Sequence, residues 1–163
     1  HCHQHTCMTL HVIVNCIDAS YAIHNDTKSH TGVLMTIGKG AIFWKSCKQK
    51  LMGKSLIEVE IIGVNDDINQ VLWTKFFLSW QHHKIKYTTV LQDNKSSILL
   101  EKNGKFSSTK NTRHIWIRYF FMTDRVKNED IQIEYCPTVD MIADFFTKPL
   151  QGSQFRKSRN LTL

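Results

Sequence analysis

The chain has 163 residues, of which 42% are hydrophobic and 21% are charged, with 7 glycines and 2 prolines. This composition is typical of one globular domain and excludes disordered, collagen-like and low-complexity chains. Lysine and arginine exceed aspartate and glutamate by 21 to 14; the net charge of +7 favours a polyanionic partner such as nucleic acid, although a soluble basic surface would show the same excess.

Residues 1–10 form no predicted element and are expected to be a frayed or linker segment. They carry a tract of histidines and cysteines, but its spacing fits no folded zinc module, so we expect adventitious metal binding only. The sequence starts at His1 without methionine or a secretory signal, which suggests a fragment of a longer protein. No uncharged apolar run approaches the roughly 18 residues of a membrane helix.

Three strands are predicted before the first helix. In residues 11–18 apolar side chains occupy both faces of an extended chain, as in a strand covered on both sides, and Asp18 ends the run. Residues 32–37 and 41–45 alternate as two further strands, joined by a Gly-Lys-Gly turn at 38–40.

A long helix is predicted from the capping box of Ser55 and Glu58 to about Ser79. Behind the box, apolar residues recur at three- and four-residue steps: Ile57, Ile61, Val64, Ile68, Leu72, Phe76 and Trp80. This stripe predicts packing on the sheet, with Asp66 and Asp67 on the solvated face.

The second half alternates strands and helices. Residues 87–92 predict a strand that ends at Asp93, and Asn94 caps a short helix that stops at Asn103. The remaining predicted elements are a helix at 115–128, a strand at 131–135, a helix over 141–147 capped by Thr138 or Asp140, and a basic helical tail at 153–161. This order predicts one α/β domain over residues 11–150, followed by a basic C-terminal tail at 151–163. Three tryptophans are expected in the core or at an interface, namely Trp44, Trp73 and Trp80.

Two predicted strands end in an aspartate, Asp18 and Asp93. If these strands are parallel neighbours, the carboxylates meet and repel, which calls for a proton, a basic side chain or a hard cation such as Mg²⁺ or Mn²⁺. Turn or helix-cap roles are the alternative. On the long helix Glu60 lies beside the buried stripe, whereas Glu58 has its capping role, so Glu60 is the better ligand candidate. Asp144, in the apolar last helix, is similarly placed.

Short motifs in a specific order, over nearly the whole chain, resemble one known family. They are Ile17-Asp18-Ala19-Ser20-Tyr21-Ala22, Lys28-Ser29-His30-Thr31-Gly32, Gly38-Lys39-Gly40-Ala41, Lys48-Gln49-Lys50, Gln92-Asp93-Asn94-Lys95-Ser96, Thr112-Arg113-His114-Ile115, Arg118-Tyr119 and Ala143-Asp144-Phe145-Phe146-Thr147-Lys148-Pro149-Leu150. On these motifs the chain resembles the ribonuclease H domain of copia-type LTR retrotransposon Pol polyproteins. The resemblance implies an RNase H-like fold, with a five-stranded mixed sheet flanked by helices, and metal-dependent cleavage of the RNA strand of RNA–DNA hybrids during reverse transcription.

The resemblance also implies the site. The family's four acidic ligands fall on Asp18, Glu60, Asp93 and Asp144, which would be both catalytic and metal-binding. They would hold two Mg²⁺ ions, or Mn²⁺, about 4 Å apart. As a hypothesis, Asp18 bridges both ions, Glu60 and Asp93 complete the ion that activates water, and Asp144 helps to hold the other.

The implied partners are an RNA–DNA hybrid and an upstream reverse transcriptase domain of the same polyprotein, with no membrane involved. An intracellular location, in a cytoplasmic virus-like particle or in the nucleus, follows from the resemblance. The five scattered cysteines, which show no paired spacing, also favour a reducing compartment.

Departures from the family pattern leave a second function open. The bulky residues Leu56 and Ile57 replace small polar ones near a ligand, and Trp116 stands where relatives place Asp or Asn. Residues 136–140 contain no histidine, although cellular ribonucleases H carry an auxiliary one there. The alternative is therefore a catalytically impaired domain that binds nucleic acid or is structural only.

Seven residues are candidates for binding nucleic acid. Phosphate contacts are expected from Lys45, Lys48, Lys50 and Lys54, with a solvated lysine face as the alternative. Recognition of the RNA 2′-hydroxyl is expected from the polar side chains beside Asp93, which are Asn94, Ser96 and Ser97. Helix capping is the alternative role of Asn94.

Overall fold

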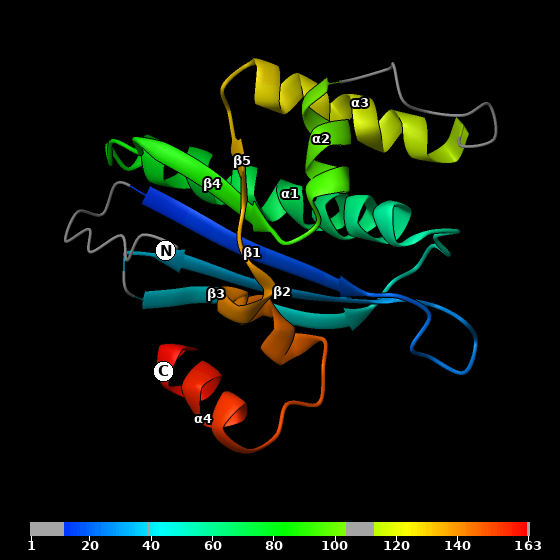
Figure 1. The fold of residues 1–163 in the computed structure, drawn as a ribbon. Coiled ribbons are helices and arrows are strands. Elements are labelled where there is room, and N and C mark those ends of the chain that lie inside the picture. The colour runs from blue at the N-terminus through cyan, green and yellow to red at the C-terminus, as the bar shows by residue number, and fades with distance from the viewer. Residues whose placement is uncertain (1–11, 39, 104–112, 163) are drawn as a thin grey trace.

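The computed structural model describes residues 12–38, 40–103 and 113–162 (Figure 1). Five strands form one sheet in the order β3-β2-β1-β4-β5. Their bounds are Val12–Ser20 (β1), His30–Ile37 (β2), Gly40–Lys48 (β3), Tyr87–Gln92 (β4) and Gln132–Tyr135 (β5). β2 is antiparallel to β1 and β3, whereas β4 is parallel to β1 and β5. The predicted five-stranded mixed sheet is confirmed.

Helical segments lie on both sides of the sheet (Figure 1). On one side are α1 (Leu56–Trp80), α2 (Lys95–Asn103) and α3 (Arg113–Lys127), packed on a core that includes Ile13 and Ile17 of β1. On the other are the 3₁₀ helices η2 (Thr138–Asp140) and η3 (Ile142–Phe146) and the helix α4 (Gly152–Thr162). There Met141 and Ala143 pack with Cys16 of β1. Both faces of the first strand are thus covered, as its pattern predicts.

The predicted capping box begins α1. The Ser55 hydroxyl oxygen accepts a hydrogen bond of 3.2 Å from the amide of Glu58. In return, Glu58 Oε2 accepts one of 2.7 Å from the amide of Lys54, one residue earlier than the usual box partner. The box fixes where α1 starts, and hence where Glu60 lies relative to the sheet.

The segment after β5 is not the predicted α-helix over 141–147. It forms the two short 3₁₀ helices instead, neither with a side-chain cap: Asp140 N–H donates to Pro137 O, and Asp144 N–H donates to Met141 O. Runs of five residues or fewer are too short to offset the cost of nucleating an α-helix, so the tighter turn forms.

Three tryptophans are expected in the core or at an interface, and the core position is wrong for all three. Trp44, Trp73 and Trp80 are 66%, 58% and 88% exposed. Val71, Leu72 and Thr74 are the residues that α1 buries in its second half. The tryptophans of α1 therefore lie on the helix surface that faces away from the sheet, where Trp73 stacks on Phe77 with ring centroids 5.0 Å apart.

The predicted solvation of Asp67 is also wrong. Its side chain is only 2% exposed, and Lys45 Nζ of β3 lies 3.6 Å from its Oδ1. The neighbouring Asp66 is exposed and accepts a hydrogen bond of 2.7 Å from Arg118 of α3. Of these two aspartates, only Asp66 thus belongs to the solvated face of α1.

The remaining expectations of the fold concern disulfides, membrane spans and the N-terminal residues. Cys16, Cys47 and Cys136 form no disulfide in the described part of the chain. Among the described residues, no helix combines the length and apolar composition needed to cross a bilayer. Residues 1–10 and the side chain of Trp116 lie outside what the structure describes.

Candidate metal centre

The parallel pairing of β1 with β4 brings two of the candidate carboxylates together. Cys16 of β1 lies opposite Leu91 of β4. Asp18 and Asp93, each two residues further along, therefore lie at the same end of the two neighbouring strands. Asp18 is 2% exposed and Asp93 is half-buried.

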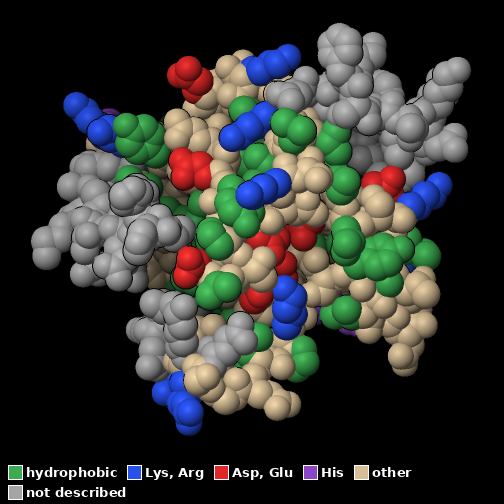
Figure 2. Space-filling view, in the orientation of Figure 1, with side chains coloured by type: hydrophobic (Ala, Val, Ile, Leu, Met, Phe, Trp, Pro, Cys, Tyr) green, Lys and Arg blue, Asp and Glu red, His purple; other side chains and the backbone are tan. Residues whose placement is uncertain are grey.

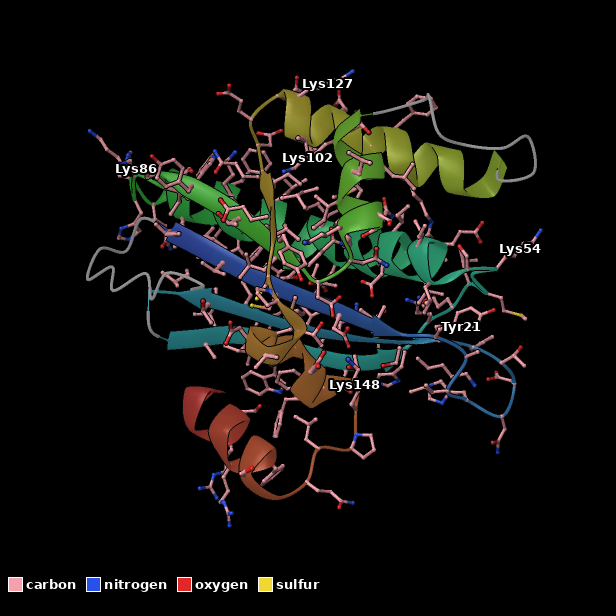
Figure 3. All side chains as sticks on the ribbon, viewed as in Figure 1. Tyr21, Lys54, Lys86, Lys102, Lys127 and Lys148 are labelled. Atoms are coloured by element: carbon pink, nitrogen blue, oxygen red, sulfur yellow. The ribbon has the colours of Figure 1, made fainter. Side chains whose placement is uncertain are left out.

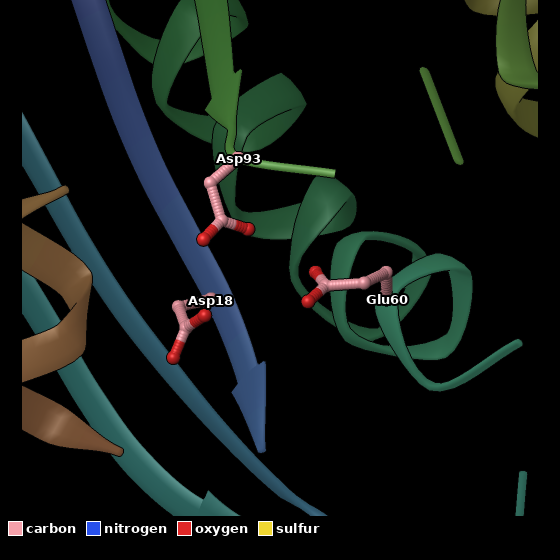
Figure 4. Close-up of side chains that lie close together, drawn as sticks. All are labelled: Asp18, Glu60 and Asp93. Atoms are coloured by element: carbon pink, nitrogen blue, oxygen red, sulfur yellow. The ribbon is translucent and has the colours of Figure 1, made fainter. Parts of the chain in front are cut away.

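Glu60 reaches the same place from the second turn of α1. One carboxylate oxygen from each of Asp18, Glu60 and Asp93 lies within 4.8 Å of the other two, and Figure 4 shows the three carboxylates around a common space. α1 lies this close to the sheet because residue 63 is glycine: a Cβ there would be 3.3 Å from the side chain of Thr31.

Burial largely sets the pKa values of Glu60 and Asp18 in this cluster. It raises the pKa of Glu60 to about 9, and the charges of Asp18 and Asp93 add to the rise. Burial also raises the pKa of Asp18 to about 6, although Thr147 and Lys148 oppose this. Glu60 Oε2 is buried and has no hydrogen-bond partner among the described residues. A buried acidic oxygen without a donor, beside two more carboxylates, suits a hard divalent cation.

Asp144 approaches from the opposite side of the sheet, in η3, and is 5% exposed. It is not one of the three carboxylates that lie within 4.8 Å of each other. Lys148 links it to them: the ammonium nitrogen is 2.8 Å from Asp144 Oδ1 and 3.7 Å from Asp18 Oδ2. The hydroxyl of Thr147 donates a hydrogen bond to the same Asp18 oxygen.

The close approach of η3 to the sheet depends on Gly32 of β2, which pairs with Asp18. A Cβ at this position would lie 2.7 Å from Thr147 Cγ2 and 2.8 Å from the Ala143 carbonyl oxygen. These distances leave no room for a side chain, so Gly32 allows η3 to lie against β2, with Thr147 hydrogen-bonded to Asp18.

Sequence reasoning assigned no role to three side chains in or behind the centre. Thr147 and Lys148 contact the candidate ligands directly, and the signal for Lys148 is its position four residues after Asp144. Glu101 of α2 is fully buried, and burial raises its pKa to about 8; its charge contributes to the raised pKa of Glu60. No local pattern marks Glu101 as buried.

The four candidate lysines differ in their surroundings. Lys45 faces Asp67, and Lys48 pairs at 2.5 Å with Asp26 in the turn after β1. Lys50 and Lys54 are exposed in the segment between β3 and α1, where Figure 3 labels Lys54. In the orientation of Figure 1, the space-filling view in Figure 2 shows acidic side chains gathered near the centre of the molecule's visible face, with basic side chains around them.

The polar residues beside Asp93 are arranged around the start of α2. Asn94 Oδ1 accepts hydrogen bonds from the amides of Ser96 and Ser97, at 3.0 and 3.2 Å, so Asn94 caps the helix. Ser97 is fully buried and donates its hydroxyl to Asn94 O. Ser96 is exposed.

Comparison with known proteins gives relatives by sequence. The chain is 31% identical over 137 residues to the retrovirus-related Pol polyprotein from transposon TNT 1-94 of Nicotiana tabacum. It is 29% identical over 133 residues to that from transposon RE1 of Arabidopsis thaliana. The matches cover 84% and 81% of this chain but only 10% and 9% of the two relatives, so the chain spans about a tenth of their length. No family model matches.

Solved structures share the fold at low sequence identity. The N-terminal RNase H domain of Rv2228c from Mycobacterium tuberculosis has a TM-score of 0.58 at 8% identity, over 91% of this chain and 96% of that one. LC11-RNase H1 in complex with an RNA/DNA hybrid has a TM-score of 0.54 at 12% identity, over 82% and 92%. The protease-reverse transcriptase of prototype foamy virus has a TM-score of 0.52 at 13% identity. The match covers 97% of this chain and 20% of that one.

Proposed function

The chain belongs to the ribonuclease H domains of retrotransposon Pol polyproteins, and on this basis we propose that it is a divalent-metal-dependent endonuclease that hydrolyses the RNA strand of RNA–DNA hybrids. The proposal includes a role in reverse transcription beside an upstream reverse transcriptase domain, since the matched region is only about a tenth of each relative. It also places the protein inside the cell, in a cytoplasmic virus-like particle or in the nucleus.

One observation carries this proposal: Asp18, Glu60 and Asp93, distant along the chain, converge within 4.8 Å on a site that includes a buried glutamate oxygen without a partner. Carboxylate oxygens are the ligands that Mg²⁺ and Mn²⁺ prefer. Three of them brought together without a cation would repel each other, so this donor set fits the metal that the family implies.

Each acidic residue of the centre would have its own role in binding the metal ions. Asp18, Glu60 and Asp93 would hold one ion, and Asp18 with Asp144 a second. Bound divalent ions supply an activated water at neutral pH and neutralise the charge that develops on the phosphate. Thr147 orients Asp18 through its hydroxyl, and the exclusion of water around Glu60 and Asp18 strengthens every charge interaction at the centre.

The substrate would be held by groups around the centre. Lys50 and Lys54 are exposed and can contact phosphates, whereas Lys45 and Lys48 would first have to leave Asp67 and Asp26. Selectivity for RNA requires recognition of the 2′-hydroxyl. Ser96 is exposed beside Asp93 and can supply that contact; Asn94 and Ser97 support it by forming the start of α2.

The alternative, a catalytically impaired domain, rests on the altered residues at the start of α1. Leu56 is 59% exposed and Ile57 is half-buried. Since the carboxylates converge despite these residues, the nuclease is the function that the geometry favours.

The test uses a labelled RNA–DNA hybrid with Mg²⁺, and with duplex DNA and EDTA as controls. We expect cleavage of the RNA strand that EDTA abolishes. Asp18→Asn should lower the rate by about 100-fold or more, whereas Asp124→Asn, on the exposed surface of α3, should not change it. Binding of the hybrid without cleavage would select the impaired domain, and unchanged cleavage by Asp18→Asn would remove the assigned site.

A further inference from the structure

The ammonium group of Lys148 lies among the carboxylates of the metal centre. It is 2.8 Å from Asp144 Oδ1 and 3.7 Å from Asp18 Oδ2, and both acids are at least nine-tenths buried. In Figure 3, Lys148 is labelled where η3 passes the ends of the central strands. Burial alone would lower the pKa of Lys148, but the hydrogen bond to Asp144 and the charge of Asp18 raise it overall. By these distances the Lys148 ammonium group pairs with both acids.

Asp18 has acidic neighbours in two directions. One carboxylate oxygen lies within 4.8 Å of oxygens from Glu60 and Asp93. Asp144 lies on the other side of the sheet, and only there does a basic group of the described chain stand between the acids. Among the described residues, Glu60 and Asp93 thus form no ion pair, whereas Asp18 and Asp144 already have a monovalent cation between them.

We propose that Lys148 is a built-in counter-cation that fills the Asp18–Asp144 side of the metal centre, so that a divalent ion can bind there only by displacing the ammonium group. This inference rests on the proposed metal-dependent function and adds an order to it. The Asp18–Glu60–Asp93 side takes its ion first, and the Asp144 side takes its ion more weakly until Lys148 moves away.

The surroundings of Lys148 allow this movement. Its side chain is 41% exposed, so water can solvate the ammonium group once it leaves the acids. Its backbone amide donates to Asp144 O at 3.0 Å, which holds the main chain in place while the side chain turns. A phosphate of the nucleic acid, brought to the centre, would offer the displaced ammonium a new partner.

The test counts bound Mn²⁺ in the whole protein, without nucleic acid, by electron paramagnetic resonance and calorimetry. In the wild-type protein we expect one Mn²⁺ to bind clearly more tightly than the second. Lys148→Met should tighten the second ion by about tenfold or more, and Lys148→Gln, which keeps a hydrogen-bond donor without the charge, should do the same. Lys127→Met, which removes an exposed lysine of α3, is the matched control and should leave both affinities unchanged.

A second readout is thermal unfolding in EDTA. Without its counter-cation the cluster repels itself, so Lys148→Met should lower Tm by about 3 °C or more, and Mn²⁺ should raise Tm further in this variant than in the wild type. Equal affinities in wild type and both Lys148 variants would overturn the inference while the metal-dependent function stands. Failure of wild type and variants alike to bind Mn²⁺ would instead refute the proposed function.

Discussion

The stability of the metal-free protein should depend on pH through Glu60. Burial raises the pKa of this carboxyl from 4.5 to about 9. Between these values the folded protein keeps a proton that the unfolded chain has released, so unfolding releases a proton and becomes easier as pH rises. The stabilisation is complete below about pH 4.5 and is lost as pH rises through about 9. We therefore expect the EDTA-treated protein to lose stability steadily in this range.

The magnitude follows from the proton balance. One retained proton changes the free energy of unfolding by about 1.4 kcal/mol per pH unit, or about 2.7 kcal/mol between pH 6 and pH 8. Glu60→Gln replaces the protonated acid by a neutral amide of the same shape and removes this contribution. For a domain of this size, the fall in Tm from pH 6 to pH 8 should shrink by about 5 to 10 °C in the variant.

The assay is thermal unfolding in EDTA at several pH values, for wild type, Glu60→Gln and the control Glu134→Gln. Glu134 is exposed in β5, so its replacement should leave the pH slope unchanged. Mg²⁺ should stabilise the wild type more at pH 8 than at pH 6, because binding requires ionised carboxylates. If wild type and Glu60→Gln show the same slope, Glu60 is not the buried neutral acid described above.

Three further predictions concern the frame of the site and its surface. Gly32→Ala should cost about 1–3 kcal/mol of stability in urea unfolding, because its Cβ would meet Thr147 at 2.7 Å, and activity should fall with it; an unaffected protein would show that η3 is not held against β2. Trp80→Lys should change stability by no more than about 0.5 kcal/mol, since Trp80 is 88% exposed, and a larger loss would mean that the ring packs on the fold. Lys50→Ala and Lys54→Ala should each lower the salt dependence of hybrid binding by about one unit of slope, since both lysines are exposed. An unchanged slope would show that these lysines do not contact the substrate.

The sequence by itself determined the strands and the start of the long helix, which depend on residues close together along the chain. Two-residue alternation predicted the strands, and the Ser55 capping box predicted the start of α1 to the residue, because both patterns follow from backbone geometry. The same patterns placed Asp18 and Asp93 at strand ends and Glu60 beside the buried stripe. Once β1 and β4 are parallel neighbours, convergence of these acids follows.

Only the tertiary structure decided which side chains meet across the fold. The buried Asp67 meets Lys45, which lies more than 20 positions earlier, and Lys148 reaches Asp18 through the docking of η3 at Gly32. Trp80 is exposed although it continues an apolar stripe, because other side chains of α1 face the core. Helical periodicity shows which residues share a surface, but burial and ion pairing depend on what packs against that surface.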